Sequence, residues 1–169
     1  PPLVERWMRA LLDPRAALPS LAVVAPGLTE GPLRGGNLAV LAALVGTPFL
    51  PPLDGAILFL EDVGEAPYRV DRMLTTLRES GALARVAGIA LGAFTESRVG
   101  DDGTPVEAVL AERLGDLGIP VVSSVPAGHV DDNHELWLGA HARLDARGTT
   151  GTLEVGVIAV APGGRTGVG

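Results

Sequence analysis

The sequence predicts an α/β domain with a mixed sheet, and three features of the chain support this prediction. Short continuous apolar runs alternate along the chain with stretches that are apolar at helical spacing. Two later segments alternate between apolar and polar residues, which is typical of antiparallel strands. With 47% apolar residues among 169, the chain can bury a substantial core. We therefore expect one α/β domain that contains some antiparallel sheet.

Composition argues against several classes of partner and cofactor. The formal net charge is −7 and the sequence contains no lysine, which argues against a protein that follows nucleic-acid phosphates. No apolar run approaches the ~20 residues needed to span a bilayer, so we expect no membrane partner. The absence of cysteine rules out a disulfide framework, a thiolate metal site and a cysteine nucleophile in this chain.

The first segment, residues 3–12, is amphipathic at helical spacing, with Leu3, Trp7, Leu11 and Leu12 on one stripe. We interpret it as a connector helix that follows an upstream domain. An apolar stripe left uncovered usually finds a partner, so we expect the chain to self-associate as a homodimer.

The next elements are short. Residues 15–20 read as a linker, 21–25 as a strand, and 26–36 as a loop punctuated by glycine and proline. Asn37 is a suitable N-cap for a helix over 38–45. The two glycines before Asn37 permit either a ligand approaching backbone N–H groups or an ordinary tight turn.

The stretch from residue 56 onward is the one around which the chain is organised. Residues 56–60 form an apolar run of strand length that ends in Glu61 and Asp62, and Gly64 then allows a turn. Pro67 is suited to the first turn of a helix. The apolar positions of this predicted helix are Tyr68, Val70, Met73, Leu74 and Leu77. Open α/β sheets usually place ligand chemistry at such strand ends, although the two carboxylates could also simply end the strand.

The remaining elements follow in order. We expect a buried strand over 86–94, a helix over 106–114 and a strand over 119–125. Residues 136–144 and 152–160 are predicted to form an antiparallel hairpin.

Glu61 and His129 both follow apolar strands, so both could reach the same sheet edge. A carboxylate bonded to one imidazole nitrogen fixes the tautomer and leaves the other nitrogen free to take a proton from a nucleophile. A histidine in a loop is more often structural, and the residues alone leave both interpretations open. None of the five serines lies in a Gly-x-Ser-x-Gly turn, so the chain looks like half of a catalytic machine.

A metal site is a competing interpretation of the same loop. His129, Asp131, Asp132 and His134 fall within six residues and carry metal-ligating groups. Catalytic zinc ligands usually come from rigid elements at fixed spacing, so an acidic loop with incidental histidines is the simpler interpretation. We expect no cofactor.

Six motifs in the same order resemble those of the LD-carboxypeptidases, the serine peptidases that include the murein tetrapeptide carboxypeptidases and the related microcin-immunity peptidases. The motifs are GGNL (35–38), VGTP (45–48), ILFLED (57–62), YRVDRML (68–74), GIALGAF (88–94) and VPAGH (125–129). Together the resemblance extends over roughly residues 26–156.

The resemblance implies a Ser-His-Glu triad in which Glu61 is the glutamate and His129 the histidine. His134 and His141 do not match the family pattern. In this family the serine belongs to an N-terminal domain, which this chain lacks, and the C-terminal domain is a small swivelling β/β/α-type domain. We therefore expect residues 1–20 to be the connector, 21–161 the C-terminal domain and 162–169 a flexible tail.

The resemblance also implies an activity for the full-length parent, in the cytoplasm. The substrate would be a murein peptide, from which a terminal D-amino acid is released by cleavage of an L,D-peptide bond. The fragment alone is expected to be inactive, because its partner would be the missing nucleophile domain. A microcin-immunity-type hydrolase of an aminoacyl-nucleotide toxin and a non-catalytic peptide-binding module are the alternatives.

Overall fold

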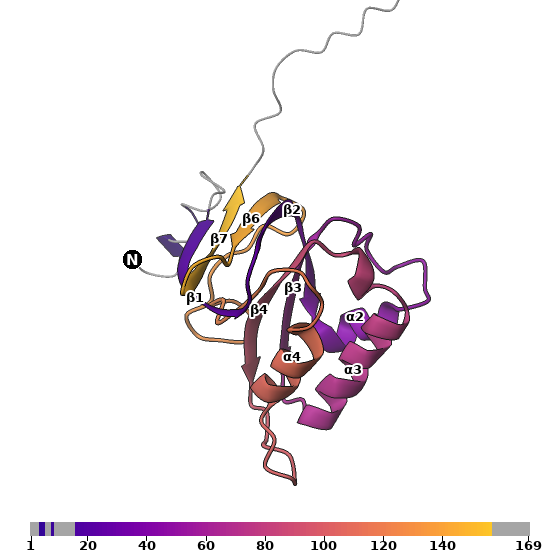
Figure 1. The fold of residues 1–169 in the computed structure, drawn as a ribbon. Coiled ribbons are helices and arrows are strands. Elements are labelled where there is room, and N and C mark those ends of the chain that lie inside the picture. The colour runs from indigo at the N-terminus through magenta and orange to yellow at the C-terminus, as the bar shows by residue number, and fades with distance from the viewer. Residues whose placement is uncertain (1–3, 6–7, 9–15, 157–169) are drawn as a thin grey trace, which may run out of the picture.

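The computed structural model describes residues 4–5, 8 and 16–156 (Figure 1). The strands are β1 (Ala16–Ala25), β2 (Leu28–Asn37), β3 (Ile57–Val63), β4 (Gly88–Thr95), β5 (Val121–Ser123), β6 (His141–Asp145) and β7 (Thr150–Gly156). The helices are α2 (Leu38–Leu44), α3 (Pro67–Glu79) and α4 (Val106–Leu114), with a 3-10 turn, η1, at Leu83–Arg85.

The strands of the described residues form one closed mixed sheet in the order β1-β5-β4-β3-β2-β6-β7, and β1 pairs with β7 to close it. The neighbours from β2 to β5 are parallel. The other pairs, including β6 with β7, are antiparallel. The prediction of an α/β domain with a mixed sheet is thus confirmed. The swivelling character implied by the family resemblance stays a prediction.

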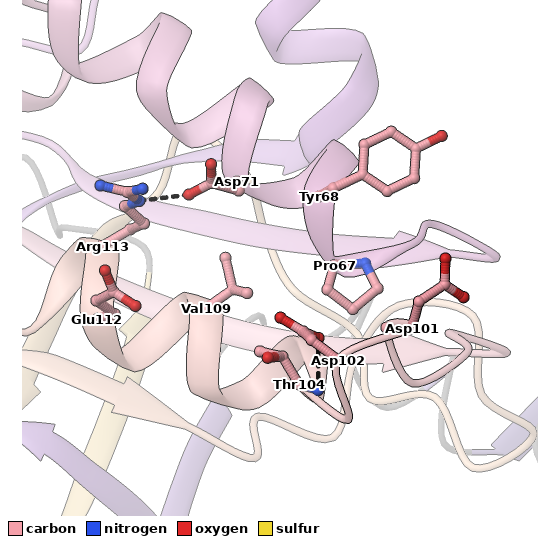
Figure 2. A pocket seen from close by; sticks show the side chains of 10 residues that line it. Pro67, Tyr68, Asp71, Asp101, Asp102, Thr104, Val109, Glu112 and Arg113 are labelled. Carbon is pink, nitrogen blue, oxygen red and sulfur yellow. Dashed lines mark hydrogen bonds and ion pairs between the residues drawn. The ribbon is translucent and has the colours of Figure 1, made fainter.

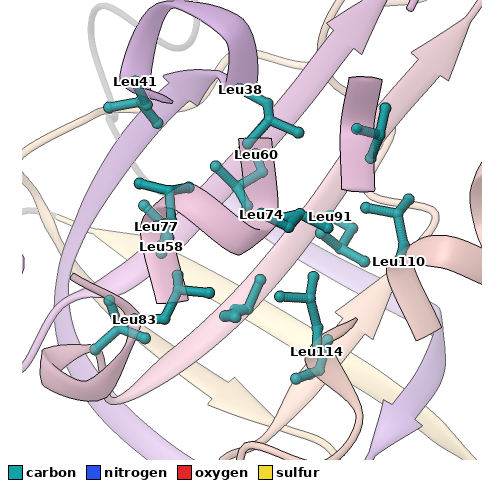
Figure 3. Close-up of a cluster of buried hydrophobic side chains, with 14 of the residues drawn as sticks. Leu38, Leu41, Leu58, Leu60, Leu74, Leu77, Leu83, Leu91, Leu110 and Leu114 are labelled. Carbon is teal, nitrogen blue, oxygen red and sulfur yellow. The ribbon is translucent and has the colours of Figure 1, made fainter. Parts of the chain in front are cut away.

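The helices connect the parallel strands and gather on one side of the sheet (Figure 1). Pro67 occupies the first turn of α3, as predicted, and α4 has the predicted bounds. Leu74 and Leu77 of α3 are fully buried against Leu58 and Leu60 of β3 in the cluster between helices and sheet (Figure 3). Burying one such leucine contributes about 1.5–3 kcal/mol, so this cluster, which we call the helix-side core, fixes β3 against the helices.

A second cluster, which we call the interior core, receives side chains from every strand. Its strand residues are Leu18, Leu21, Leu33, Ile57, Phe59, Ala90, Val122, Ala142, Leu144, Leu153 and Val155. Because β3 sends Ile57 and Phe59 to the interior core and Leu58 and Leu60 to the helix-side core, its side chains alternate between the two. This alternation decides where the next two residues of β3 point.

Two predictions for the N-terminal part were wrong. Residues 16–20, expected as linker, form the first half of β1, with a register shift between Leu18 and Leu21 where Ser20 has a φ of 64°. Residues 28–36, expected as loop, form most of β2. A Cβ on Gly35 would lie 1.9 Å from the Phe59 carbonyl oxygen. The glycines that suggested a loop instead allow close backbone approach within the sheet.

Other boundaries differ by a few residues. β3 continues through Glu61 and Asp62 to Val63, where the prediction ended the strand at residue 60. β5 is shorter than predicted, because Ser124 adopts a φ of 65° and leaves the strand. Residues 136–140 precede β6 and are not part of it. Tyr68, placed on the apolar stripe of α3, is 64% exposed.

The predicted stripe of Leu3, Trp7, Leu11 and Leu12, and the tail 162–169, lie outside the described residues. The same holds for residues 157–160 of the last predicted strand. Within the part that is described, no helix has the length and apolar character needed to cross a membrane.

Candidate active site

Glu61 and Asp62 are consecutive buried carboxylates of β3, with 7% and 3% of their surfaces exposed. The alternation along β3 places them on opposite faces of the sheet. Glu61 approaches the loop that follows β5, whereas Asp62 reaches the first turn of α2. The two residues were expected just beyond the strand, but they belong to it, so the sheet itself fixes their directions.

The loop after β5 continues along the edge of β4. Val125 N donates to the Leu91 carbonyl at 3.0 Å, and Ala93 N donates to the Ala127 carbonyl at 2.9 Å. These bonds carry the chain past the end of the short strand β5 and deliver residues 128 and 129 beside β3. The same packing needs a glycine on β4, because a Cβ on Gly92 would lie 2.5 Å from the Ala127 oxygen.

His129 and Glu61 meet at this point. The imidazole Nδ1 of His129 lies 2.8 Å from Oε2 of Glu61. The His129 side chain is 56% exposed while the Glu61 side chain is 9% exposed, so the carboxylate supports the ring from the protein side. Since Glu61 is an acceptor, Nδ1 donates to it, and Nε2 of the neutral ring is then free to accept a proton.

The Glu61 carboxylate raises the pKa of His129 above its ordinary value of 6.5, mainly through this hydrogen bond and then through its charge. Asp62 and Glu96 add smaller charge effects in the same direction, and desolvation opposes them. The pair therefore favours the imidazolium form, which is the form that follows proton abstraction by His129.

Three further hydrogen bonds fix the loop that carries His129. Thr95 Oγ1 donates to the His129 carbonyl at 3.2 Å. Gly128 N donates to Asn133 Oδ1 at 3.1 Å, and His134 N donates to the Pro126 carbonyl at 2.7 Å. The sequence analysis did not identify Thr95, Gly128 or Asn133 as site residues. The one available signal was the glycine that immediately precedes His129.

The alternative metal interpretation of this loop gains no support from the geometry. Within the described residues, no group of three or more histidine, aspartate or glutamate side chains is arranged to hold a metal ion. His129 instead uses Nδ1 for Glu61.

A pocket of about 520 Å³ lies elsewhere, between the start of α3, the loop near residue 100 and α4 (Figure 2). Its acidic lining includes Asp101, Asp102 and Glu112, and an ion pair joins Arg113 to Asp71 across its wall. Neither Glu61 nor His129 lines it. The pocket is therefore separate from the Glu61–His129 pair.

The hydroxyls of the described serines do not reach the pair. Ser80 Oγ donates to the Leu77 carbonyl, and Ser97 Oγ lies 3.5 Å from the Thr95 carbonyl. Among the described residues, no serine hydroxyl is hydrogen-bonded to His129. The imidazole therefore has an orienting carboxylate but no serine partner within this part of the chain.

The family profile of the LD-carboxypeptidase C-terminal domain matches residues 30–144, a range that contains both Glu61 and His129. This chain belongs to the LD-carboxypeptidase family. The family assignment agrees with the motifs at both strand ends.

Individual relatives agree with it. Over 129 residues the chain is 50% identical to a candidate carboxypeptidase of Synechocystis sp., covering 75% of this chain and 42% of that protein. The crystal structure of muramoyltetrapeptide carboxypeptidase from Oxalobacter formigenes superposes with a TM-score of 0.81 at 36% identity, covering 90% of this chain and 54% of the other. The chain spans about two fifths of the length of the curated relatives it matches.

The microcin C7 self-immunity protein MccF of Escherichia coli is a further LD-carboxypeptidase relative, 31% identical over 121 residues, which cover 70% of this chain and 35% of that protein. The structure of MccF in complex with aspartyl sulfamoyl adenosine superposes with a TM-score of 0.70 at 26% identity, over 80% of this chain and 40% of the other.

Proposed function

We propose that this chain supplies the glutamate and histidine of a serine carboxypeptidase that releases a terminal D-amino acid from murein peptides in the cytoplasm. The observation that carries the proposal is the 2.8 Å contact between His129 Nδ1 and Glu61 Oε2. It is the arrangement that a histidine base and its orienting carboxylate adopt in hydrolases with a triad.

In this mechanism His129 moves the proton and Glu61 orients it. A serine hydroxyl oxygen attacks the carbonyl carbon of the L,D-peptide bond while its proton passes to His129 Nε2. The tetrahedral intermediate then collapses, the carbon–nitrogen bond breaks, and Nε2 returns the proton to the leaving amine of the D-amino acid. Water repeats both steps and releases the acyl group. Glu61 stabilises the imidazolium that forms in each half of the reaction.

The nucleophile in this proposal comes from outside the chain. The described serines make contacts away from His129, and the chain corresponds to about two fifths of its relatives. The solvent-exposed side of His129 is the side to which a second domain would bring its serine. The isolated chain is accordingly expected to have no carboxypeptidase activity.

The murein substrate is proposed because relatives of this chain carry that activity in their names, including the murein tetrapeptide carboxypeptidase of Pseudomonas aeruginosa. The likeness to MccF favours one second candidate, hydrolysis of an aminoacyl-nucleotide compound. Both reactions use the same pair, and the substrate pocket of the whole protein would separate them.

The test compares the two substrates on the whole protein that contains this chain. Release of a D-amino acid from an L,D-tetrapeptide is measured beside hydrolysis of aspartyl sulfamoyl adenosine. We expect turnover of the tetrapeptide, its loss in His129→Ala, and near wild-type turnover in His134→Ala, the matched control on the same loop. Turnover of neither compound by the wild-type protein, or full activity in His129→Ala, would refute the proposal.

A further inference from the structure

Asp62 is a buried carboxylate held by neutral donors. Its side chain accepts from Asn37 Nδ2 at 2.9 Å and Val63 N at 2.8 Å through Oδ1, and from Ala39 N at 3.0 Å through Oδ2. Within the described residues it forms no ion pair. A buried charge is costly unless it is hydrogen-bonded, so these donors are what keeps Asp62 in place.

The donors belong to the junction between β2 and α2. Asn37 is the last residue of β2 and lies opposite Glu61 in the parallel β2–β3 register. Its Oδ1 accepts from Val40 N at 3.1 Å and caps α2, while its Nδ2 is bound to Asp62. A single carboxylate thus joins the end of β2, the start of α2 and β3 at the level of Glu61.

On its other side Glu61 lacks a regular strand neighbour. Leu60 pairs with Leu91 of β4, but Asp62 pairs with Phe94, so β4 has one extra residue opposite Glu61. Such an irregularity interrupts the ladder and bends the strand locally. The backbone position of Glu61 therefore depends more on the β2 side, where Asp62 makes its contacts.

We propose that Asp62 is a positioning residue that fastens the β2–α2 junction to β3 and so holds Glu61 against His129. Asp62 acts through Glu61 and does not touch His129. Its charge is one of three that act on the ring, with Glu61 on the same strand and Glu96 after β4. Asp131, Asp132 and His134 share the loop of His129.

The test observes the His129 ring in the protein labelled with ¹⁵N-histidine, before any activity is measured. Asp62→Asn replaces one acceptor oxygen by an NH₂ group, so one of the three donors faces another donor. We expect the Nδ1–H signal of His129 to broaden through faster exchange with water, and the pKa of His129 to fall. Glu96→Gln removes a nearby charge without touching the junction. It should lower the pKa of His129 slightly and keep the Nδ1–H signal sharp.

Two further variants separate positioning from general stability. Leu41→Val weakens the packing of α2 without altering Asp62, and it should lower the melting temperature with an unchanged Nδ1–H signal. The double variant Asn37→Asp/Asp62→Asn exchanges the amide and the carboxylate across the same contact, and it should restore part of the signal lost in Asp62→Asn. A sharp Nδ1–H signal in Asp62→Asn would overturn the inference, as would equal broadening in Leu41→Val.

The kinetic consequence rests on the proposed function. In the whole protein, Asp62→Asn should lower kcat by up to about 100-fold, the loss associated with a misplacement of about 1 Å, and leave KM nearly unchanged. A wild-type protein without peptidase activity refutes the proposed function alone. The positioning inference is then still decided by the Nδ1–H signal.

Discussion

Gly128 and Glu61 are in contact, and a Cβ on Gly128 would lie 3.0 Å from both the Cβ and the Oε2 of Glu61. Gly128 also has a φ of 120°, a conformation that other residues rarely adopt. The close approach of His129 to Glu61 therefore depends on the absence of a side chain at the preceding residue.

Gly128→Ala should displace Glu61 or His129 and lower the kcat/KM of the whole protein by about 100-fold. Gly103→Ala is the matched control, because Gly103 also has a positive φ, 85°, but open space around it. Steady-state kinetics on one L,D-tetrapeptide would compare the two variants. Equal losses in both would show that backbone strain, and not the contact with Glu61, is responsible.

Glu61→Gln keeps the shape of the side chain but removes its charge. By analogy with the loss of the carboxylate in other triads, it should lower kcat of the whole protein by about 10,000-fold. His129→Ala should cost at least as much, and the double variant should be barely worse than His129→Ala, because triad residues act as a unit. Losses that multiply in the double variant, or an equal loss in Asp62→Asn, would require the roles to be reassigned.

The pH dependence of activity should report the raised pKa of His129. His129 accepts a proton only when neutral, so kcat/KM should rise with pH and reach half its plateau above pH 6.5, the ordinary histidine value. Glu61→Gln removes the main cause of the shift and should move this midpoint to lower pH. An NMR titration of His129 gives the same pKa independently. A midpoint in the wild-type protein at or below the ordinary value would contradict the assignment of His129 as the base.

The helix-side core should dominate the stability of the domain. Leu74→Ala removes a fully buried side chain of α3 (Figure 3) and should reduce the free energy of unfolding by about 2–5 kcal/mol. Val40→Ala, at a position 58% exposed on α2, should change it by less than about 0.5 kcal/mol. Urea unfolding followed by circular dichroism measures both, and similar midpoints for the two variants would contradict the packing described.

Two adjacent glycines of β2 offer a sharper contrast. A Cβ on Gly35 would lie 1.9 Å from the Phe59 carbonyl oxygen, whereas a Cβ on Gly36 would meet nothing within 4 Å. Both have positive φ, 130° and 145°. Gly36→Ala should therefore cost about 1–3 kcal/mol from backbone strain, and Gly35→Ala should cost more because β2 must also separate from β3. Thermal melting of the two variants would decide, and a less stable Gly36→Ala would be inconsistent with this register.

The helices and the buried parallel strands could be predicted because their signals are local. Pro67 opens α3 and Asn37 caps α2, and apolar runs identify β3 and β4. β2 could not be predicted, because LTEGPLRGGN has the composition of a loop. Its glycines are required by backbone atoms of β3 that are distant in sequence, so only the folded sheet explains them.

The candidate site divides in the same way. Glu61 and His129 could be identified from the strand ends they follow and from the resemblance to the family. Their contact could not be derived, because it depends on the path of residues 125–128 along β4. Thr95 and Asn133 escaped notice since a hydroxyl or amide bonded to a backbone group has no recognisable spacing in the sequence.

The closure of the sheet has a consequence for synthesis on the ribosome. Ala22 of β1 lies between Ser123 of β5 and Thr150 of β7, so both neighbours of the first strand are translated long after it. Until they emerge, β1 offers unpaired backbone groups and the uncovered side chains of Leu18 and Leu21 to other chains. A nascent chain that stops short of β7 can already contain Glu61 and His129, yet its sheet is still open. Such a chain would need a chaperone more than the finished domain does.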